Sequence, residues 1–176
     1  MFKKTPEYKN TAAKISVILT LALGLFLFIM ANSGSIALPW LAQLFAIASI
    51  TYAVEIAVIY LLRRYTFIIE PMSEISDSGE EAYDLIINER RSNRELKVCH
   101  VSVKHIEFIR VVNSENKKTV KKERKVRTRY TYNTQFAAPR LLEIVIEGGG
   151  ENASLLVSYD EELINALLSV GVRKIQ

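Results

Sequence analysis

The stretch Ile15–Val54, ISVILTLALGLFLFIMANSGSIALPWLAQLFAIASITYAV, decides the fold of this 176-residue chain. It is forty consecutive residues without a charge, whereas one helix needs only about 20 apolar residues to cross a hydrocarbon core of about 30 Å. A cluster of turn-forming residues, Asn32–Ser35, interrupts it, and Pro39 suits the first turn of a second helix. We therefore predict a transmembrane helical hairpin over residues 11–62, with helices at about 11–31 and 39–62.

Cations flank the predicted hairpin at one end only. The connecting loop has no Lys or Arg. Four lysines lie before the first helix or in its first turn, and two arginines follow the second helix: Lys3, Lys4, Lys9, Lys14, Arg63 and Arg64. The positive-inside rule then orients both termini toward the cytoplasm. We expect a multi-pass protein of the cell (inner or plasma) membrane, with residues 1–10 as a basic cytoplasmic tail. A signal peptide cleaved near Ala31–Ser33 is the alternative. The apolar part of a signal peptide is typically only about 7–15 residues long, and the apolar stretch of the first helix is longer than that.

Glu55 introduces a carboxyl group into the second predicted helix, eight residues before Arg63 and thus about 12 Å along a helix. Ionisable groups inside a membrane are costly and suggest a function. One hypothesis is a proton or ion relay; the other is a hydrogen-bonded carboxyl that ties the hairpin together or joins protomers. Antiparallel packing predicts that Ser16 and Thr20 lie within its reach. Small residues that permit close helix contact are Gly24, Ala46, Ala48, Ser49 and Ala53.

Residues 63–176 change to short segments rich in Val, Ile, Tyr and Thr, which is typical of an antiparallel β domain. Seven strands are predicted, at residues 66–70, 83–89, 96–101, 106–112, 125–136, 141–147 and 153–159. Alternation along residues 125–136 places Tyr130 and Tyr132 on an apolar face, and Arg127 and Arg129 on a basic, solvent-facing side.

A helix is predicted to close the chain. Ser158 and Glu161 have the spacing of a capping box, and Gly171 ends an apolar stripe that begins at Leu163. Such a stripe is typical of a helix that packs against a sheet or over the open end of a barrel.

This order of elements, a two-helix hairpin followed by seven strands and a helix, resembles the bacterial pleckstrin-homology-like membrane proteins. The resemblance covers about residues 63–170 and is carried by Arg63-Arg64-Tyr65, Asp84-Leu85-Ile86-Ile87, Arg90-Arg91 and Leu155-Leu156-Val157-Ser158-Tyr159. It implies a membrane α-helical hairpin followed by an all-β or α+β domain, namely a seven-stranded antiparallel open barrel with a C-terminal capping helix. It also implies a scaffold or sensor role at the bilayer surface, and it carries no site residues.

Eight cations gather around the single Glu123: Lys117, Lys118, Lys121, Lys122, Arg124, Lys125, Arg127 and Arg129. Near an anionic leaflet each adds about 1 kcal/mol of binding energy. Because the hairpin already anchors the chain, contact with anionic lipid headgroups would orient the domain rather than recruit it. A solvated hairpin loop explains the same residues equally well. Nucleic-acid binding is disfavoured, because the neighbouring tyrosines alternate onto the apolar face.

The sequence gives little indication of catalysis. Cys99, His100 and His105 are three loosely spaced ligands without an acidic or second thiol partner, so we predict no metal site. Gly148–Gly150 lies between two predicted strands and not before a helix, which indicates a turn rather than a phosphate cradle. No nucleophile elbow is present, and we expect no enzyme activity and no cofactor.

We therefore expect a non-enzymatic binding or scaffold protein with two membrane spans, acting through a protein partner or self-association. The alternative is a small subunit of a transport or ion-translocating membrane assembly that uses Glu55.

Overall fold

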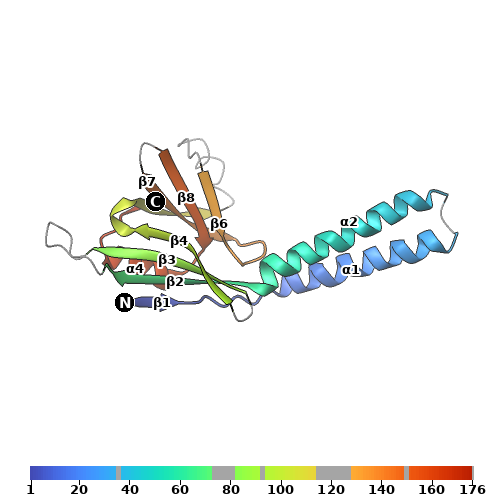
Figure 1. Cartoon of the computed structure of the whole chain (residues 1–176), viewed down its shortest axis with the longest axis horizontal. Helices are drawn as coiled ribbons and strands as arrows, with labels where there is room; N and C mark the ends of the chain where they lie inside the picture. The colour runs from blue at the N-terminus through green and yellow to red at the C-terminus, as the bar shows by residue number, and fades with distance from the viewer. Residues whose placement is uncertain (35–36, 73–81, 92–93, 114–127, 149–150, 176) are drawn as a thin grey trace. The chain divides into compact units, whose positions relative to one another are not determined.

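The computed structural model describes residues 1–34, 37–72, 82–91, 94–113, 128–148 and 151–175. The chain forms two compact units: residues 8–63, and a second unit built from residues 1–7 together with 64–176. Figure 1 shows that the first is a pair of helices and the second is rich in strands. The coarse prediction, two long apolar helices followed by a β-rich domain, is confirmed.

The helical unit contains α1 (Thr11–Asn32) and α2 (Pro39–Ala57), and α2 continues as a π-helical segment, η1 (Val58–Leu62). Both stretches, Thr11–Asn32 and Pro39–Leu62, are long and apolar enough to cross a membrane. Pro39 opens α2 as predicted, since its fixed φ suits a first helical turn and its missing N–H is not needed there.

α1 and α2 pack through a seam of small residues. The buried residues are Ala13, Gly24 and Ala31 on α1 and Ala42, Ala46, Ala53 and Ile56 on α2. A Cβ at Gly24 would lie 2.8 Å from Cγ1 of Ile50 and 3.1 Å from the carbonyl oxygen of Ala46, so this close approach requires glycine. The prediction that small residues permit helix contact is confirmed for Gly24, Ala46 and Ala53, whereas Ala48 is exposed.

The β unit consists of two sheets. Sheet A has the order β1-β2-β3-β4, formed by β1 (Phe2–Lys4), β2 (Arg63–Pro71), β3 (Tyr83–Arg91) and β4 (Arg94–Ser102). Sheet B has the order β6-β8-β7-β5-β9, formed by β5 (Ile106–Asn113), β6 (Thr128–Tyr132), β7 (Arg140–Gly148), β8 (Glu151–Ser158) and β9 (Lys174–Ile175). The short 3-10 helix η2 (Val103–His105) joins β4 to β5, and α4 (Glu161–Ser169) follows β8.

The predicted seven-stranded barrel of the pleckstrin-homology-like type is wrong. Among the described residues neither sheet closes, and the chain adds β1 to sheet A and β9 to sheet B. In sheet B, β6 pairs in parallel with β8 and not with β5, its predecessor in the chain. Six predicted strands are confirmed within three residues at each end, as β2, β3, β4, β5, β7 and β8.

The strand predicted over residues 125–136 is shorter than expected. Residues 125–127 lie outside the described residues, and the strand β6 ends at Tyr132. After it, the Asn133 side chain accepts a hydrogen bond from the Gln135 backbone N–H at 2.9 Å, which turns the chain away from the sheet.

The helix α4 begins differently from the prediction. Asp160 is the N-cap, and its carboxylate accepts a hydrogen bond from the Leu163 N–H at 3.0 Å. Ser158 instead donates its hydroxyl to the Asn133 side chain at 2.7 Å. Asp160 is the more effective cap because its charge also interacts favourably with the helix N-terminus. The helix buries Leu163, Ile164 and Leu167 in the main core.

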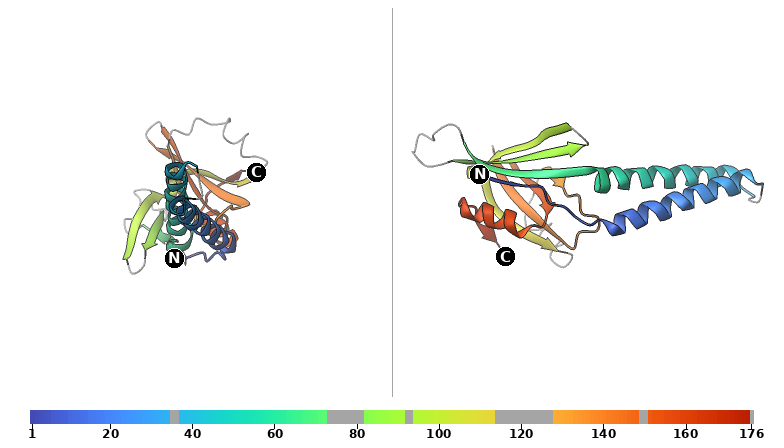
Figure 2. Two further views of the ribbon diagram at one scale, coloured as in Figure 1. Left: turned by 90° about the vertical axis from the view of Figure 1, so that its right-hand side faces the viewer. Right: turned by 90° about the horizontal axis from the view of Figure 1, so that it is seen from below.

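The N-terminal strand β1 was not predicted. Phe2 lies opposite Ile69 and Lys4 lies opposite Phe67 in the antiparallel pair of β1 and β2. Figure 2 shows α4, in red, beside the blue β1. The Lys4 ammonium lies 2.8 Å from a carboxylate oxygen of Asp160 and 3.0 Å from one of Glu162. The residues predicted as a basic cytoplasmic tail therefore include a strand that pairs with the β unit.

Candidate functional site

Only one member of the predicted basic cluster is described. Arg129 lies in β6, whereas the remaining members fall outside the described residues: Lys117, Lys118, Lys121, Lys122, Arg124, Lys125 and Arg127. Arg129 was expected on a basic side facing solvent or lipid. Its side chain is 37% exposed, and its Nη2 lies 3.4 Å from Oε1 of Glu143. This arginine therefore turns partly inward, toward a buried carboxylate.

Glu143 is the centre of a buried ion-pair cluster on sheet B. Its side chain is 0% exposed, and its Oε2 accepts a hydrogen bond at 2.7 Å from Nε of Arg110, whose side chain is 9% exposed. The two residues are direct cross-strand partners in the register of β5 and β7. Arg129 approaches the other carboxylate oxygen and also lies 3.4 Å from the Ser154 hydroxyl.

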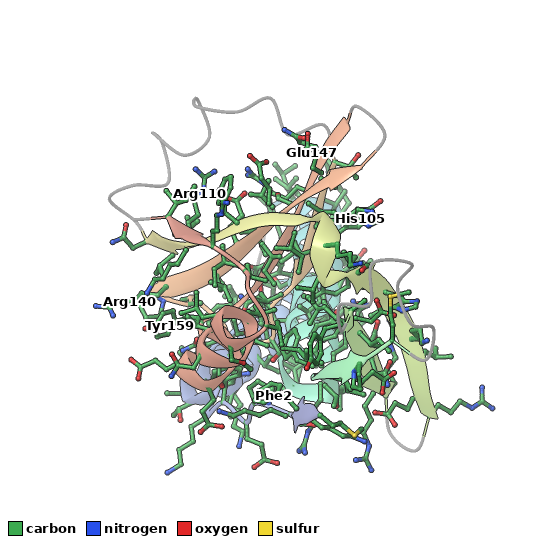
Figure 3. The ribbon with its side chains drawn as sticks, turned by 90° about the vertical axis from the view of Figure 1, so that its left-hand side faces the viewer. Phe2, His105, Arg110, Arg140, Glu147 and Tyr159 are labelled. Carbon is green, nitrogen blue, oxygen red and sulfur yellow. The ribbon has the colours of Figure 1, made fainter. Side chains whose placement is uncertain are left out.

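The cluster lies on the face of sheet B that points away from the main core. Strand alternation turns Leu142 and Ile144 into that core, so Glu143 between them points to the opposite face. In Figure 3, Arg110 and Phe2 of β1 lie on opposite sides of the β unit. A buried carboxylate held between two guanidinium groups has its charge compensated. The arrangement is suited to fixing the register of β5, β6 and β7.

A signal for Glu143 is present in the sequence. Its neighbours two positions away, Leu141 and Val145, are both apolar, so an acidic residue interrupts an otherwise apolar strand face. The arginines that pair with it come from strands distant in sequence, and only the register brings them together.

A second polar group surrounds Tyr132 at the end of β6. Its hydroxyl donates to the Val98 carbonyl at 3.3 Å, and its ring packs edge-on against Tyr65 with centroids 5.4 Å apart. Burial raises the pKa of Tyr132 to about 12, and the nearby Cys99 contributes in the same direction. Tyr132 thus packs against the core as predicted, whereas Tyr130 is 48% exposed.

The Cys99 thiol is a weak nucleophile. Burial raises its pKa above the usual value, while a hydrogen bond with Tyr132 acts in the opposite direction without cancelling the effect. A thiol must lose its proton to attack or to bind a metal. His100 pairs with Asp84 at 2.8 Å. Within the described ranges, three or more His, Cys, Asp or Glu residues nowhere gather closely enough to hold a metal ion.

Glu55 is exposed on α2 and lies outside the seam with α1. Its side chain forms no hydrogen bond or ion pair with any described residue. No hydrogen bond joins this side chain to Ser16 or Thr20, and the Thr20 hydroxyl donates to the Ser16 carbonyl of its own helix at 2.7 Å. Beyond the end of α2, the Asn10 side chain donates to the Tyr60 carbonyl at 2.6 Å and links the start of α1 to η1.

Comparison with known proteins gives no relative: no family model, no curated protein and no solved structure matches this chain. The assignment of a function therefore depends on the residues and geometry of the chain itself.

Proposed function

We propose that this chain is a non-enzymatic, membrane-anchored binding or scaffold protein that presents its β unit at the cytoplasmic surface of the cell membrane. The pairing of β1 with β2 is the observation that carries the proposal. β1 precedes the first apolar helix, and β2 follows the second. Strands that share backbone hydrogen bonds lie on one side of a bilayer, so the pairing favours a hairpin that enters and returns.

The distribution of cations supports the cytoplasmic side. Lys9, Lys14, Arg63 and Arg64 belong to the end of the hairpin that leads to the two paired strands, whereas residues 32–38 contain neither Lys nor Arg. Positively charged residues close to the ends of a span favour the cytoplasmic face.

The connections between the helices and the sheet are short. β2 begins at Arg63, directly after η1 ends at Leu62, and six residues separate Lys4 of β1 from Thr11 of α1. Six residues extend at most about 20 Å. Such connections hold a domain close to the lipid headgroups, where the basic cluster at residues 117–129 can set its orientation.

The polar groups of the β unit support binding over catalysis. The Glu143 carboxylate is shared by two arginines, and the Cys99 thiol is disfavoured as a nucleophile. Neither arrangement provides an activated group for chemistry.

Cross-linking and co-purification from native membranes test the binding role. The full chain is compared with a chain that keeps the hairpin but carries an unrelated soluble domain in place of residues 64–176. We expect a discrete partner, in a stoichiometric amount, with the full chain alone. Recovery of the same proteins with both chains would contradict a binding role for the β unit.

The exposed position of Glu55 favours one second candidate, a subunit of a transport or ion-translocating assembly. A carboxyl that faces away from α1 is placed where another subunit can complete an intramembrane path. Glu55→Gln separates the candidates. Loss of flux with intact assembly would support transport, and preserved assembly and activity would eliminate it.

A further inference from the structure

The helix α2 has two opposite faces. One face, with Ala46, Ala53 and Ile56, is buried against α1. At about 100° per residue, Glu55 lies about 160° around the helix from Ala53. Its carboxyl is therefore directed almost opposite to α1, and it is exposed.

A carboxyl group in this position needs a polar partner. Glu55 is about 12 Å along the helix from Arg63, well inside a hydrocarbon core of about 30 Å. Ionisable residues in membrane helices almost always face the interior of a bundle or a water-filled cavity, where they find hydrogen-bonding groups. α1 supplies no hydrogen bond to Glu55. The partner must therefore approach the outer face of α2.

The surface around Glu55 has the composition of a helix–helix contact in a membrane. Thr51 is one turn before Glu55 and Ala48 two turns before it, Tyr52 borders them, and all three are exposed. Leu44 extends the same face by one more turn. Glu55 offers hydrogen-bond acceptors, Thr51 and Tyr52 offer hydroxyl donors, and Ala48 allows close approach, which together are the features of such contacts.

We propose that two copies of this chain associate in the membrane through this outer face of α2, formed by Leu44, Ala48, Thr51, Tyr52 and Glu55. Copies in one membrane share an orientation, so a second copy necessarily brings the same groups to the same depth. Around a two-fold axis along the membrane normal, each Glu55 carboxyl accepts a hydrogen bond from a Thr51 or Tyr52 hydroxyl of the other copy. Every such bond forms twice, as is usual for a two-fold contact.

This inference rests on the proposed function, because it requires α2 to lie in a membrane. It also deepens that function. A dimer displays two β units on the same membrane face, and a partner with two binding sites then gains avidity without any new contact.

Cysteine cross-linking of the full chain in membranes tests the proposal. In a Cys99→Ser background, Ala48→Cys and Leu44→Cys place a thiol on the outer face of α2 without altering Glu55, Thr51 or Tyr52. Matched controls are Phe26→Cys and Ile29→Cys, exposed positions of α1 at comparable distances from the cytoplasmic helix ends. A membrane-permeant oxidant, copper phenanthroline, then reports which faces meet.

We expect disulfide-linked dimers with Ala48→Cys and Leu44→Cys and at least about tenfold less with the α1 controls. Adding Glu55→Leu should reduce dimer formation about tenfold, the factor expected for loss of one or two intramembrane hydrogen bonds. Glu55→Gln should retain most of it, because an amide still forms hydrogen bonds. Leucine is compatible with insertion, and the amount of chain in the membrane fraction controls for it.

Dimers that persist with Glu55→Leu would overturn the proposal, as would equal cross-linking of the two helices or failure of both α2 positions to cross-link. Recovery of the chain in membranes as a monomer would contradict only the proposed dimer. A chain that is missing from membranes contradicts the proposed function itself.

Discussion

Arg110 and Glu143 face each other across β5 and β7, with 2.7 Å between Nε and Oε2, and both side chains are almost completely buried. A buried pair of this kind adds little to stability relative to an apolar pair of the same shape, but its loss on one side leaves a charge without compensation. Loss of either side chain of this pair is therefore expected to destabilise sheet B.

We predict that Glu143→Gln lowers the free energy of unfolding by about 3–5 kcal/mol, because Arg110 then keeps a buried charge without a counter-ion. Thermal and urea unfolding of the purified protein in detergent, followed by near-ultraviolet circular dichroism, measures the change. Glu147→Gln, at an exposed position of the same strand, is the matched control and should change stability by less than about 0.5 kcal/mol. Equal effects of the two substitutions would contradict the account.

Asp160 is predicted to stabilise both the start of α4, as its N-cap, and the attachment of β1, through its ion pair with Lys4. Asp160→Asn keeps a capping oxygen but loses the charge that pairs with Lys4, so hydrogen exchange should accelerate in residues 1–7 and change little in α4. Asp160→Ala removes the cap as well, at a cost of about 1 kcal/mol, and should accelerate exchange in both segments. Unchanged exchange of β1 in both variants would show that the ion pair does not hold the strand.

The pairing of Lys4 also predicts a dependence on pH. Burial lowers the pKa of Lys4, but hydrogen bonds and charges of Asp160 and Glu162 outweigh burial, so the pKa is raised overall. The contribution of this contact is therefore complete below the pKa of an unfolded lysine, about 10.4, and is lost as the pH rises through the raised value. Exchange of β1 should accelerate selectively in that alkaline range, and less so in Asp160→Asn.

Tyr132 should ionise at a higher pH than an unfolded tyrosine. Its phenol, with a pKa of about 12, retains its proton in the folded state at a pH where an unfolded tyrosine, with a pKa of about 10, has lost it. Stability should therefore fall between about pH 10 and 12. Absorbance at the phenolate band follows the titration, and Tyr132→Phe should remove the component with a pKa of about 12. An unchanged titration curve would refute the assignment.

The basic cluster is predicted to contact anionic lipid. A soluble β unit can be made by linking Glu7 to Arg64, whose side chains already lie 3.3 Å apart. The test variant replaces four lysines with Gln: Lys117, Lys118, Lys121 and Lys122. Its binding to anionic vesicles should be weaker at least about tenfold, given about 1 kcal/mol per residue, and its binding to neutral vesicles should be unaffected. Lys97→Gln with Lys104→Gln is the control. Equal binding by the original and the fourfold variant would refute the prediction.

The sequence was sufficient for the elements that carry a strong local pattern. The uncharged run Ile15–Val54 predicted both helices, and β-branched segments predicted six of the strands. β1 and β9 were missed because strands of three and two residues are too short to show alternation. The parallel pairing of β6 with β8 depends on contacts between distant segments, which a local pattern does not report.

The same limit applied to the candidate sites. Hydropathy identified Glu55, but its direction depends on which residues of α2 form the seam, and only packing determines that Ala46 and Ala53 do so. Arg129 was predicted on an outward side by alternation alone. The strand register of sheet B brings Arg129 close to the buried Glu143, and this carboxylate attracts the Arg129 guanidinium inward.

The central claim is that the hairpin crosses the membrane twice and leaves both paired strands, β1 and β2, on the cytoplasmic side. Single cysteines in a Cys99→Ser background test it directly with a membrane-impermeant maleimide, applied to intact and to permeabilised cells. The account predicts that Ser33→Cys, between the helices, is labelled in intact cells, and that Glu7→Cys and Glu95→Cys are labelled only after permeabilisation. Labelling of Glu7→Cys or Glu95→Cys in intact cells, or protection of Ser33→Cys, would contradict it.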